Sequence, residues 1–174
     1  ILGDHQLNNI STSIAASRNI FNIKDNDIIN GIKNISLRGR LEEIKNGRLK
    51  KIAGNNRLIV DGGHNISASL SIANWVKNQN KEVNLIVGMM KDKEHIEFIK
   101  PFKNIVKSVT LINIPNQDGA IINENLKNKL DHLKFNLKLS DGIEESIKSL
   151  SINENTIILC IGSLYLAGEI LSLN

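Results

Sequence analysis

From residue 57 onward, short continuous apolar segments alternate with segments whose apolar residues recur at helical spacing. The apolar segments are RLIVD at 57–61, VNLIVG at 83–88, SVTLINI at 108–114, FNLKL at 135–139 and TIILCIG at 156–162. Strands that are apolar on both faces are typical of parallel sheets with helices on both sides. With right-handed crossovers, this pattern predicts an α/β fold with a Rossmann-like, doubly wound, mostly parallel sheet.

The segments between these strands carry the apolar stripes of amphipathic helices. The expected helices are marked by Ile66 to Val76, Ile96 with Ile99, Ile122 to Leu133, Ile143 with Ile147, and a last segment that begins at Ser163.

Upstream of this alternation, the sequence predicts two helices and a hairpin. The spacing of apolar residues indicates a helix over about residues 5–20 and a second, short helix around 28–32. The segment RLEEIKNGRLKKI at 40–52 is interpreted as two short strands around Asn46 and Gly47, a pair that tolerates the positive φ angles of a two-residue turn.

Composition excludes several classes of function. A chain of 174 residues that is 41% hydrophobic and 23% charged is long enough to bury a sizeable core. Its net charge of +4 is spread along the chain and only 3% of its residues are aromatic, so no nucleic-acid partner is expected. Cys160 is the only cysteine, which excludes an internal disulfide and a cysteine cluster for zinc. No apolar run approaches the ~20 residues of a membrane span, so no membrane partner and a cytoplasmic location are predicted.

Three of the predicted strands end in turns with polar residues: DGGHN at 61–65, GMMKDKEH at 88–95 and GSLYLAGE at 162–169. Taken singly, each has an ordinary structural interpretation, since Asp61 can bind backbone amides and Ser163 can cap a helix. Ligands of open α/β sheets bind at the carboxyl ends of the strands, where these turns would meet. An acid there suits ribose hydroxyls, and a helix N-terminus with a hydroxyl suits a carboxylate or phosphate. A nucleotide and an acidic small molecule are therefore the expected ligands, although neither GxGxxG nor GxxxxGK[ST] occurs.

Five motifs in order resemble the C-terminal part of folylpolyglutamate synthase and dihydrofolate synthase, members of the Mur ligase superfamily. They are GDHQLNN at 3–9, RGRLE at 38–42, LIVDGGHN at 58–65, GMMKDKE at 88–94 and IGSLYLAGEI at 161–170. DGGHN and GSLYLAGE are the most specific of them, since the family has DGAHN and GSLYLVGE. The chain departs from the family at Arg38, where a proline is usual, at Gly63, which replaces alanine, and at Ile66, which replaces a proline.

The resemblance implies an ATP-dependent amide ligase that joins L-glutamate to dihydropteroate or folate through an acyl phosphate. It also implies that residues 1–36 are the last helices and linker of a central ATP-binding domain, and that 37–174 form the C-terminal, glutamate-ligase domain. ATP and Mg²⁺ are the implied cofactors, with the phosphate loop and the Mg²⁺ ligands in a missing N-terminal domain, which is the expected partner. The chain alone is accordingly predicted to be inactive, and the whole enzyme to be a monomer.

On the nucleotide side, the resemblance implies roles for three residues. Asn9 would face the base and ribose of ATP, and Asp61 would accept hydrogen bonds from the ribose hydroxyls. Arg40 would be a catalytic residue that reaches the terminal phosphates with its guanidinium fork.

On the glutamate side, the resemblance implies three further contacts. Ser163 would hold a carboxylate of glutamate at the N-terminus of the last helix, and Lys93 would add a second contact. His64 would be catalytic by positioning the glutamate or the folate tail. A neutral His64 can also accept a proton from the glutamate ammonium, and the sequence does not choose between these roles.

Two alternatives stay open at this stage. One is the corresponding domain of another ligase of the superfamily, which acts on cell-wall or cyanophycin-like peptides. The other is a non-catalytic nucleotide-binding or amino-acid-binding module that has kept the fold.

Overall fold

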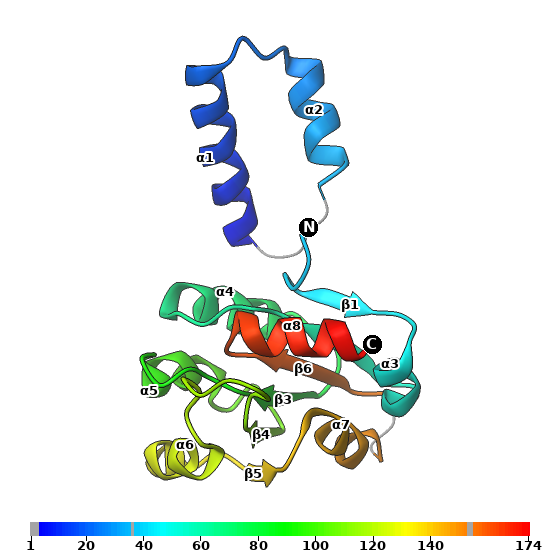
Figure 1. Ribbon diagram of the computed structural model, residues 1–174, viewed down its shortest axis with the longest axis vertical. Coiled ribbons are helices and arrows are strands. Elements are labelled where there is room, and N and C mark those ends of the chain that lie inside the picture. The colour runs from blue at the N-terminus through cyan, green and yellow to red at the C-terminus, as the bar shows by residue number, and fades with distance from the viewer. Residues whose placement is uncertain (1–3, 36, 153–154) are drawn as a thin grey trace.

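A six-stranded sheet in the order β1-β2-β6-β3-β4-β5 forms the centre of the molecule (Figure 1). The structure, a computed structural model, describes residues 4–35, 37–152 and 155–174. The strands are β1 (Glu42–Ile44), β2 (Arg57–Val60), β3 (Val83–Val87), β4 (Ser108–Ile112), β5 (Leu137–Ser140) and β6 (Ile157–Ile161). Every neighbouring pair is parallel except β1 and β2, which are antiparallel. The predicted mostly parallel, Rossmann-like α/β fold is confirmed.

Helices cover both faces of this sheet. One face packs against α4 (Ile66–Lys77), α5 (His95–Ile99) and α6 (Asn123–Leu130), together with 3₁₀ turns η1 (Lys100–Phe102) and η2 (Asp131–Leu133). The other packs against α3 (Arg48–Ala53), α7 (Ile143–Ser151) and α8 (Leu164–Leu173).

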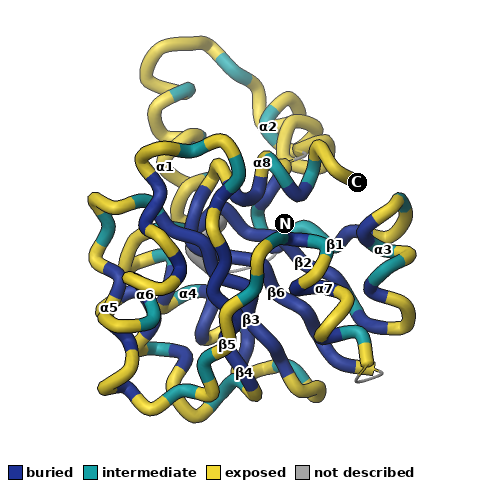
Figure 2. Tube along the Cα trace, turned by 60° about the horizontal axis from the view of Figure 1, so that its bottom comes forward, coloured by how far each residue is buried: buried dark blue, intermediate teal, exposed yellow. Residues whose placement is uncertain are grey.

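The central strands are buried along their whole length because both of their faces are covered (Figure 2). Alternate residues of β6 point to opposite cores, with Leu159 in the α4–α6 core and Cys160 in the α3–α7–α8 core. Burial raises the pKa of the Cys160 thiol to about 12, so this cysteine behaves as an apolar core residue. Helices on both faces of the sheet therefore explain the continuous apolar runs in the sequence, as predicted.

The N-terminal helices α1 (Asp4–Ile20) and α2 (Asp25–Lys33) run antiparallel and stand away from the sheet, and α1 contacts α4 (Figure 1). No described residue of α2 is buried, and the Ile29 side chain on its apolar stripe is 47% exposed. The predicted domain boundary falls at residue 36, which lies outside the described residues, as does the start of the GDHQLNN motif at 3. The division into 1–36 and 37–174 stays a prediction.

The predicted hairpin at 40–52 is wrong in its second half. The first strand exists as β1, but it pairs with β2 in the register Glu42↔Val60. Gly47, at φ 93°, opens a turn into helix α3 instead of into a second strand. Leu49 and Ala53, four residues apart on this helix, are both fully buried against the core beneath α7. Helical spacing of these two residues thus outweighs the local turn signal.

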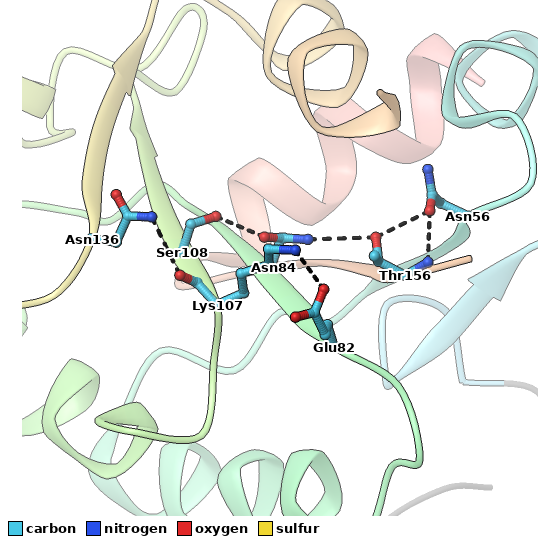
Figure 3. A network of polar contacts seen from close by, with 7 residues as sticks. All are labelled: Asn56, Glu82, Asn84, Lys107, Ser108, Asn136 and Thr156. Carbon is cyan, nitrogen blue, oxygen red and sulfur yellow. Dashed lines mark hydrogen bonds and ion pairs between the residues drawn. The ribbon is translucent and has the colours of Figure 1, made fainter. Parts of the chain in front are cut away.

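A buried chain of polar side chains crosses four strands near their amino ends (Figure 3). The amide oxygen of Asn56 accepts hydrogen bonds from the Thr156 amide (2.8 Å) and hydroxyl (3.0 Å). The Thr156 hydroxyl accepts from the Asn84 amide group (3.4 Å), whose oxygen accepts from the Ser108 hydroxyl (2.8 Å). Since an unpaired buried polar group is costly, this chain favours one register of β2, β6, β3 and β4. It lies at the end of the sheet opposite the predicted site.

No helix in the described part of the chain is both long and apolar enough to cross a lipid bilayer.

Candidate active site

The turns that follow β2, β6 and β3 lie side by side at the carboxyl edge of the sheet. Main-chain hydrogen bonds join them: the Gly162 amide donates to the Gly63 carbonyl (3.0 Å), and the Gly88 amide donates to the Ile161 carbonyl (3.3 Å). Sheet order places β6 between β2 and β3, so the turn after β6 bridges the other two. The three sequence motifs therefore form one surface, as the parallel topology predicted.

Asp61 lies beneath this surface, with 1% of the residue exposed. Its Oδ1 accepts a hydrogen bond from the Gly63 amide (2.6 Å), and its Oδ2 accepts one from the Leu41 amide (2.8 Å). The carboxylate thus ties its own turn to the turn that carries Arg40. The ribose contact of Asp61 stays a prediction.

Arg40 is partly exposed on the turn beside Asp61. Among the described residues, its guanidinium has no hydrogen-bond or ion-pair partner. Its neighbour Arg38 differs, because Nε of Arg38 donates to Oε1 of Glu42 at 2.8 Å. Of these two arginines, Arg40 is the one whose five N–H donors are open to a ligand.

The ring of His64 has a defined orientation. Its Nδ1 lies 2.9 Å from the Gly62 carbonyl oxygen. A carbonyl only accepts hydrogen bonds, so Nδ1 carries the hydrogen and, in the neutral ring, Nε2 presents a lone pair. Neutral His64 therefore offers an acceptor to a ligand.

His64 also lies between two adjoining cavities of about 260 and 370 Å³. Asp92 and Lys93, from the loop after β3, line both cavities as well. Ser163 and Tyr165, from the start of α8, line the smaller one. A cavity of this size fits an amino acid, and its polar groups come from three different strand ends.

Lys93 forms an ion pair with Asp92, with 2.8 Å between Nζ and Oδ2. The hydrogen bond from Lys93 lowers the pKa of Asp92 from its ordinary value, and the charge of the ammonium adds to this effect. Because an ammonium has three donors, Lys93 can bind a second anion while it keeps this contact.

Ser163 is the N-cap of α8, and its hydroxyl oxygen accepts a hydrogen bond from the Tyr165 amide (3.1 Å). Only 2% of the residue is exposed, although it contributes to the wall of the smaller cavity. An acceptor hydroxyl at a helix N-terminus retains its own hydrogen for donation to an anion. The N-cap interpretation of the sequence and a ligand contact are therefore compatible.

Asn9 lies apart from these residues. It is exposed on α1 and lines a cavity of about 320 Å³ between α1 and α2, with Ile14, Ile28 and Ile32. The structure does not bring Asn9 to the cavities that His64 lines. Its predicted contact with ATP stays a prediction.

The role of His95 was not predicted from the sequence, because this residue belongs to a charged segment, KDKEH at 91–95, that resembles a solvated loop. The residue is 4% exposed, and its Nε2 lies 3.0 Å from the Met90 carbonyl oxygen. Lys129 reaches its Nδ1 at 3.4 Å, and burial is the main cause that lowers the pKa of His95. Neutral His95 therefore fastens the loop that carries Lys93.

Mg²⁺ is one of the cofactors that the resemblance implies. This ion takes six oxygen ligands in octahedral arrangement, and in most sites one or two carboxylates, several waters and the phosphates of a substrate supply them. No group of three or more His, Cys, Asp or Glu side chains among the described residues is placed to hold a metal ion. The location of the Mg²⁺ ligands outside this chain stays a prediction.

Comparison with known proteins places this site in a family. Residues 47–164 match the family described as "Mur ligase, glutamate ligase domain". A probable dihydrofolate synthetase of Schizosaccharomyces pombe is 25% identical over 186 residues, which cover 96% of this chain and 42% of the relative.

Solved structures of similar fold agree with this match. Mycobacterium tuberculosis folylpolyglutamate synthase, complexed with ADP and AMPPCP, has a TM-score of 0.83 and 16% identity, over 98% of this chain and 40% of that chain. Escherichia coli FolC, in complex with DHPP and ADP, has a TM-score of 0.74 and 22% identity, over 95% of this chain and 38% of that chain. At these identities the likeness shows the fold, and the chain spans about two fifths of the length of these relatives.

The family match extends over more than half of the chain and includes Asp61, His64, Lys93 and Ser163. The resemblance inferred from DGGHN and GSLYLAGE is thereby confirmed, and the chain belongs to the Mur ligase family through its glutamate ligase domain.

Proposed function

We propose that this chain is the glutamate-side domain of an ATP-dependent ligase that joins L-glutamate to dihydropteroate or folate. The observation that carries the proposal is the cavity at the carboxyl edge of the sheet, where His64, Lys93 and Ser163 come together from three turns. Lys93 and Ser163 can donate hydrogen bonds to the two carboxylates of glutamate, and His64 can accept one from its amine.

The proposed reaction has two steps. A carboxylate oxygen of the acceptor attacks the γ-phosphorus of ATP, which forms an acyl phosphate and releases ADP. The glutamate nitrogen then attacks the carbonyl carbon, and the amide forms as phosphate and a proton leave. Alignment and charge neutralisation are the main contributions that a protein makes to such a transfer.

Arg40 would stabilise the charge on the transferred phosphoryl group, because its guanidinium is held beside the site without a partner among the described residues. Asn9 would face the base and ribose of ATP, and Asp61 would accept hydrogen bonds from the ribose hydroxyls. Mg²⁺ and the phosphate-binding loop are assigned to the three fifths of the relatives that this chain does not cover. That part would be the partner of this domain in a monomer located in the cytoplasm, and residues 1–174 alone would not release phosphate.

His64 would act on the amine of glutamate, and Ser163 with Lys93 on its carboxylates. The Nε2 lone pair suits an ammonium hydrogen, whereas it repels a carboxylate. The tautomer set by Gly62 supports the acceptor role, which the sequence left open.

The functional proposal is tested by phosphate release from ATP in the complete protein that contains this chain. Release is expected to need both L-glutamate and a pteroate or folate acceptor. Activity with nucleotide-linked peptides in place of the folate would favour another ligase of the family, and ATP binding without turnover would favour a binding module.

Replacing His64 by asparagine is expected to lower kcat/KM for glutamate at least about tenfold, because the amide of asparagine reaches only the position of Nδ1. Glutamine reaches close to Nε2 and carries an acceptor oxygen, so His64→Gln should retain more activity than His64→Asn. The KM for ATP should stay unchanged in both variants. Equal losses in the two variants, or a rise in the KM for ATP alone, would contradict the acceptor role.

A further inference from the structure

The loop between β3 and α5 carries Lys93, and its first residues are attached to the segment before α6. The Lys91 amide donates a hydrogen bond to the Gly119 carbonyl at 2.9 Å. The Lys91 ammonium donates a second one to the Asp118 carbonyl at 2.7 Å. The loop is therefore anchored two residues before Lys93, and the position of Lys93 also depends on what holds the loop after it.

His95 closes the loop on this other side. It is the first residue of α5, and its Nε2 lies 3.0 Å from the oxygen of the Met90 carbonyl, five residues earlier. A carbonyl only accepts hydrogen bonds, so Nε2 carries the hydrogen. The residue is 4% exposed, which protects this bond from competition with water. Lys93 lies inside the loop that the bond closes.

Lys129 favours the same tautomer of His95 from the side of α6. Its Nζ lies 3.4 Å from Nδ1 of His95, and an ammonium only donates, so Nδ1 presents its lone pair. Burial has the largest effect on the pKa of His95 and lowers it, and the charge of Lys129 also lowers it, whereas the Met90 carbonyl raises it. The ring is therefore held neutral, with its one hydrogen directed at Met90.

The side chain of Lys93 needs such an anchor because its own ion pair does not supply one. Its Nζ contacts Oδ2 of Asp92, which belongs to the same loop and would move with it. Lys93 lines both cavities that His64 lines. The distance from the Lys93 ammonium to the other polar groups of these cavities is therefore set by the two ends of the loop.

We propose that His95 is a positioning residue for Lys93, and that its Nε2–H bond to the Met90 carbonyl holds the Lys93 ammonium where a carboxylate of glutamate binds. The inference rests on the proposed function, in which Lys93 contacts this carboxylate. Misplacement of a binding group by about 1 Å can cost a hundredfold. Loss of the bond should accordingly weaken the binding of glutamate and leave the binding of ATP unaffected.

Two substitutions in the complete protein separate the two ring nitrogens of His95. The amide of asparagine reaches only the position of Nδ1, whereas the amide of glutamine reaches close to Nε2 and carries N–H donors. We expect His95→Asn to raise the KM for glutamate about tenfold or more, and His95→Gln to raise it by less than about threefold, since only the first loses the bond that places a charged donor. The KM for ATP should stay unchanged in both variants.

A double-mutant cycle with Lys93→Ala shows whether the effect passes through Lys93. In this background, His95→Asn should change kcat/KM for glutamate by less than about threefold, because the residue to be positioned is gone. An undiminished effect without Lys93 would overturn the inference, and so would equal KM values for glutamate in His95→Asn and His95→Gln. A residue that only stabilises the fold would lower the amount of active protein without raising the KM for glutamate alone.

Two further measurements complete the test. If His95→Asn does not fold, His95→Phe takes its place, because phenylalanine keeps a buried ring and has no N–H for Met90. It should raise the KM for glutamate only when Lys93 is present, and a wild-type KM would overturn the inference. A wild-type protein without glutamate-dependent phosphate release would refute the proposed function itself, which differs from an active enzyme whose KM for glutamate is insensitive to His95.

Discussion

Replacing Arg40 by alanine is expected to lower kcat of the complete ligase by about 10²–10³-fold, the range found when a donor to developing transition-state charge is removed. The guanidinium would meet the charge that spreads over the phosphoryl group during transfer, so the loss should fall on kcat more than on the KM for ATP. Steady-state rates of phosphate release at saturating substrates measure this effect.

Two variants serve as controls for Arg40. Arg40→Lys keeps the charge but loses the planar fork, and should recover only part of the activity. Arg38→Ala removes a neighbouring arginine that is already paired with Glu42 on the surface, and should change kcat by less than about threefold. Similar losses for Arg38→Ala and Arg40→Ala would show that the positive charge of the turn, and not Arg40 itself, is what matters.

Replacing Gly162 by alanine is expected to destabilise the protein by about 2–4 kcal/mol. Gly162 has φ 110°, a conformation that side chains rarely adopt, and an added Cβ would lie 2.7 Å from the Gly88 carbonyl oxygen. That oxygen belongs to the backbone at the end of β3, so relief of the contact must separate the turns after β6 and β3. Chemical denaturation of the complete protein measures the change in the free energy of unfolding.

Gly168, six residues further along, is the matched control. It lies on the exposed side of α8, where an added Cβ meets nothing within 4 Å. Gly168→Ala should stabilise the helix by about 0.5–1 kcal/mol, since alanine loses less backbone entropy in a helix. If Gly162→Ala were as stable as the wild type, the close approach of the two turns would not exist in solution.

Much of the fold was predictable because burial on both faces leaves a direct mark in the sequence. The runs TIILCIG and VNLIVG have no polar alternation, and both became fully buried central strands. Asn46–Gly47 was misleading because a turn signal specifies where the chain bends, but it does not specify whether a strand or a helix comes after the bend. The segment forms a helix because a helix buries both Leu49 and Ala53 against α7, which lies far away in the sequence.

For the candidate site, the sequence predicted which turns come together, but it did not predict the contacts that their side chains make. Asp61 had two interpretations in the sequence, and the structure shows backbone amides as its partners. No local pattern reveals that Leu41, 20 residues earlier, donates to it. His95 was missed for a similar reason, since its ring contacts Lys129, which lies 34 residues away in the sequence. These contacts join segments that are far apart in the sequence, so no local motif predicts them.

The central claim is that this domain serves a ligase that works through an acyl phosphate, and isotope transfer tests it most directly. The acceptor is supplied with ¹⁸O in the carboxylate that becomes the amide, and the products are analysed by mass spectrometry after turnover by the complete protein with ATP and L-glutamate. The account predicts one ¹⁸O atom in each phosphate released, because the carboxylate oxygen bridges carbon and phosphorus before the amine attacks. Label in AMP would indicate an acyl adenylate in place of an acyl phosphate and would contradict the account. Phosphate that carries no label while the amide forms would contradict it as well.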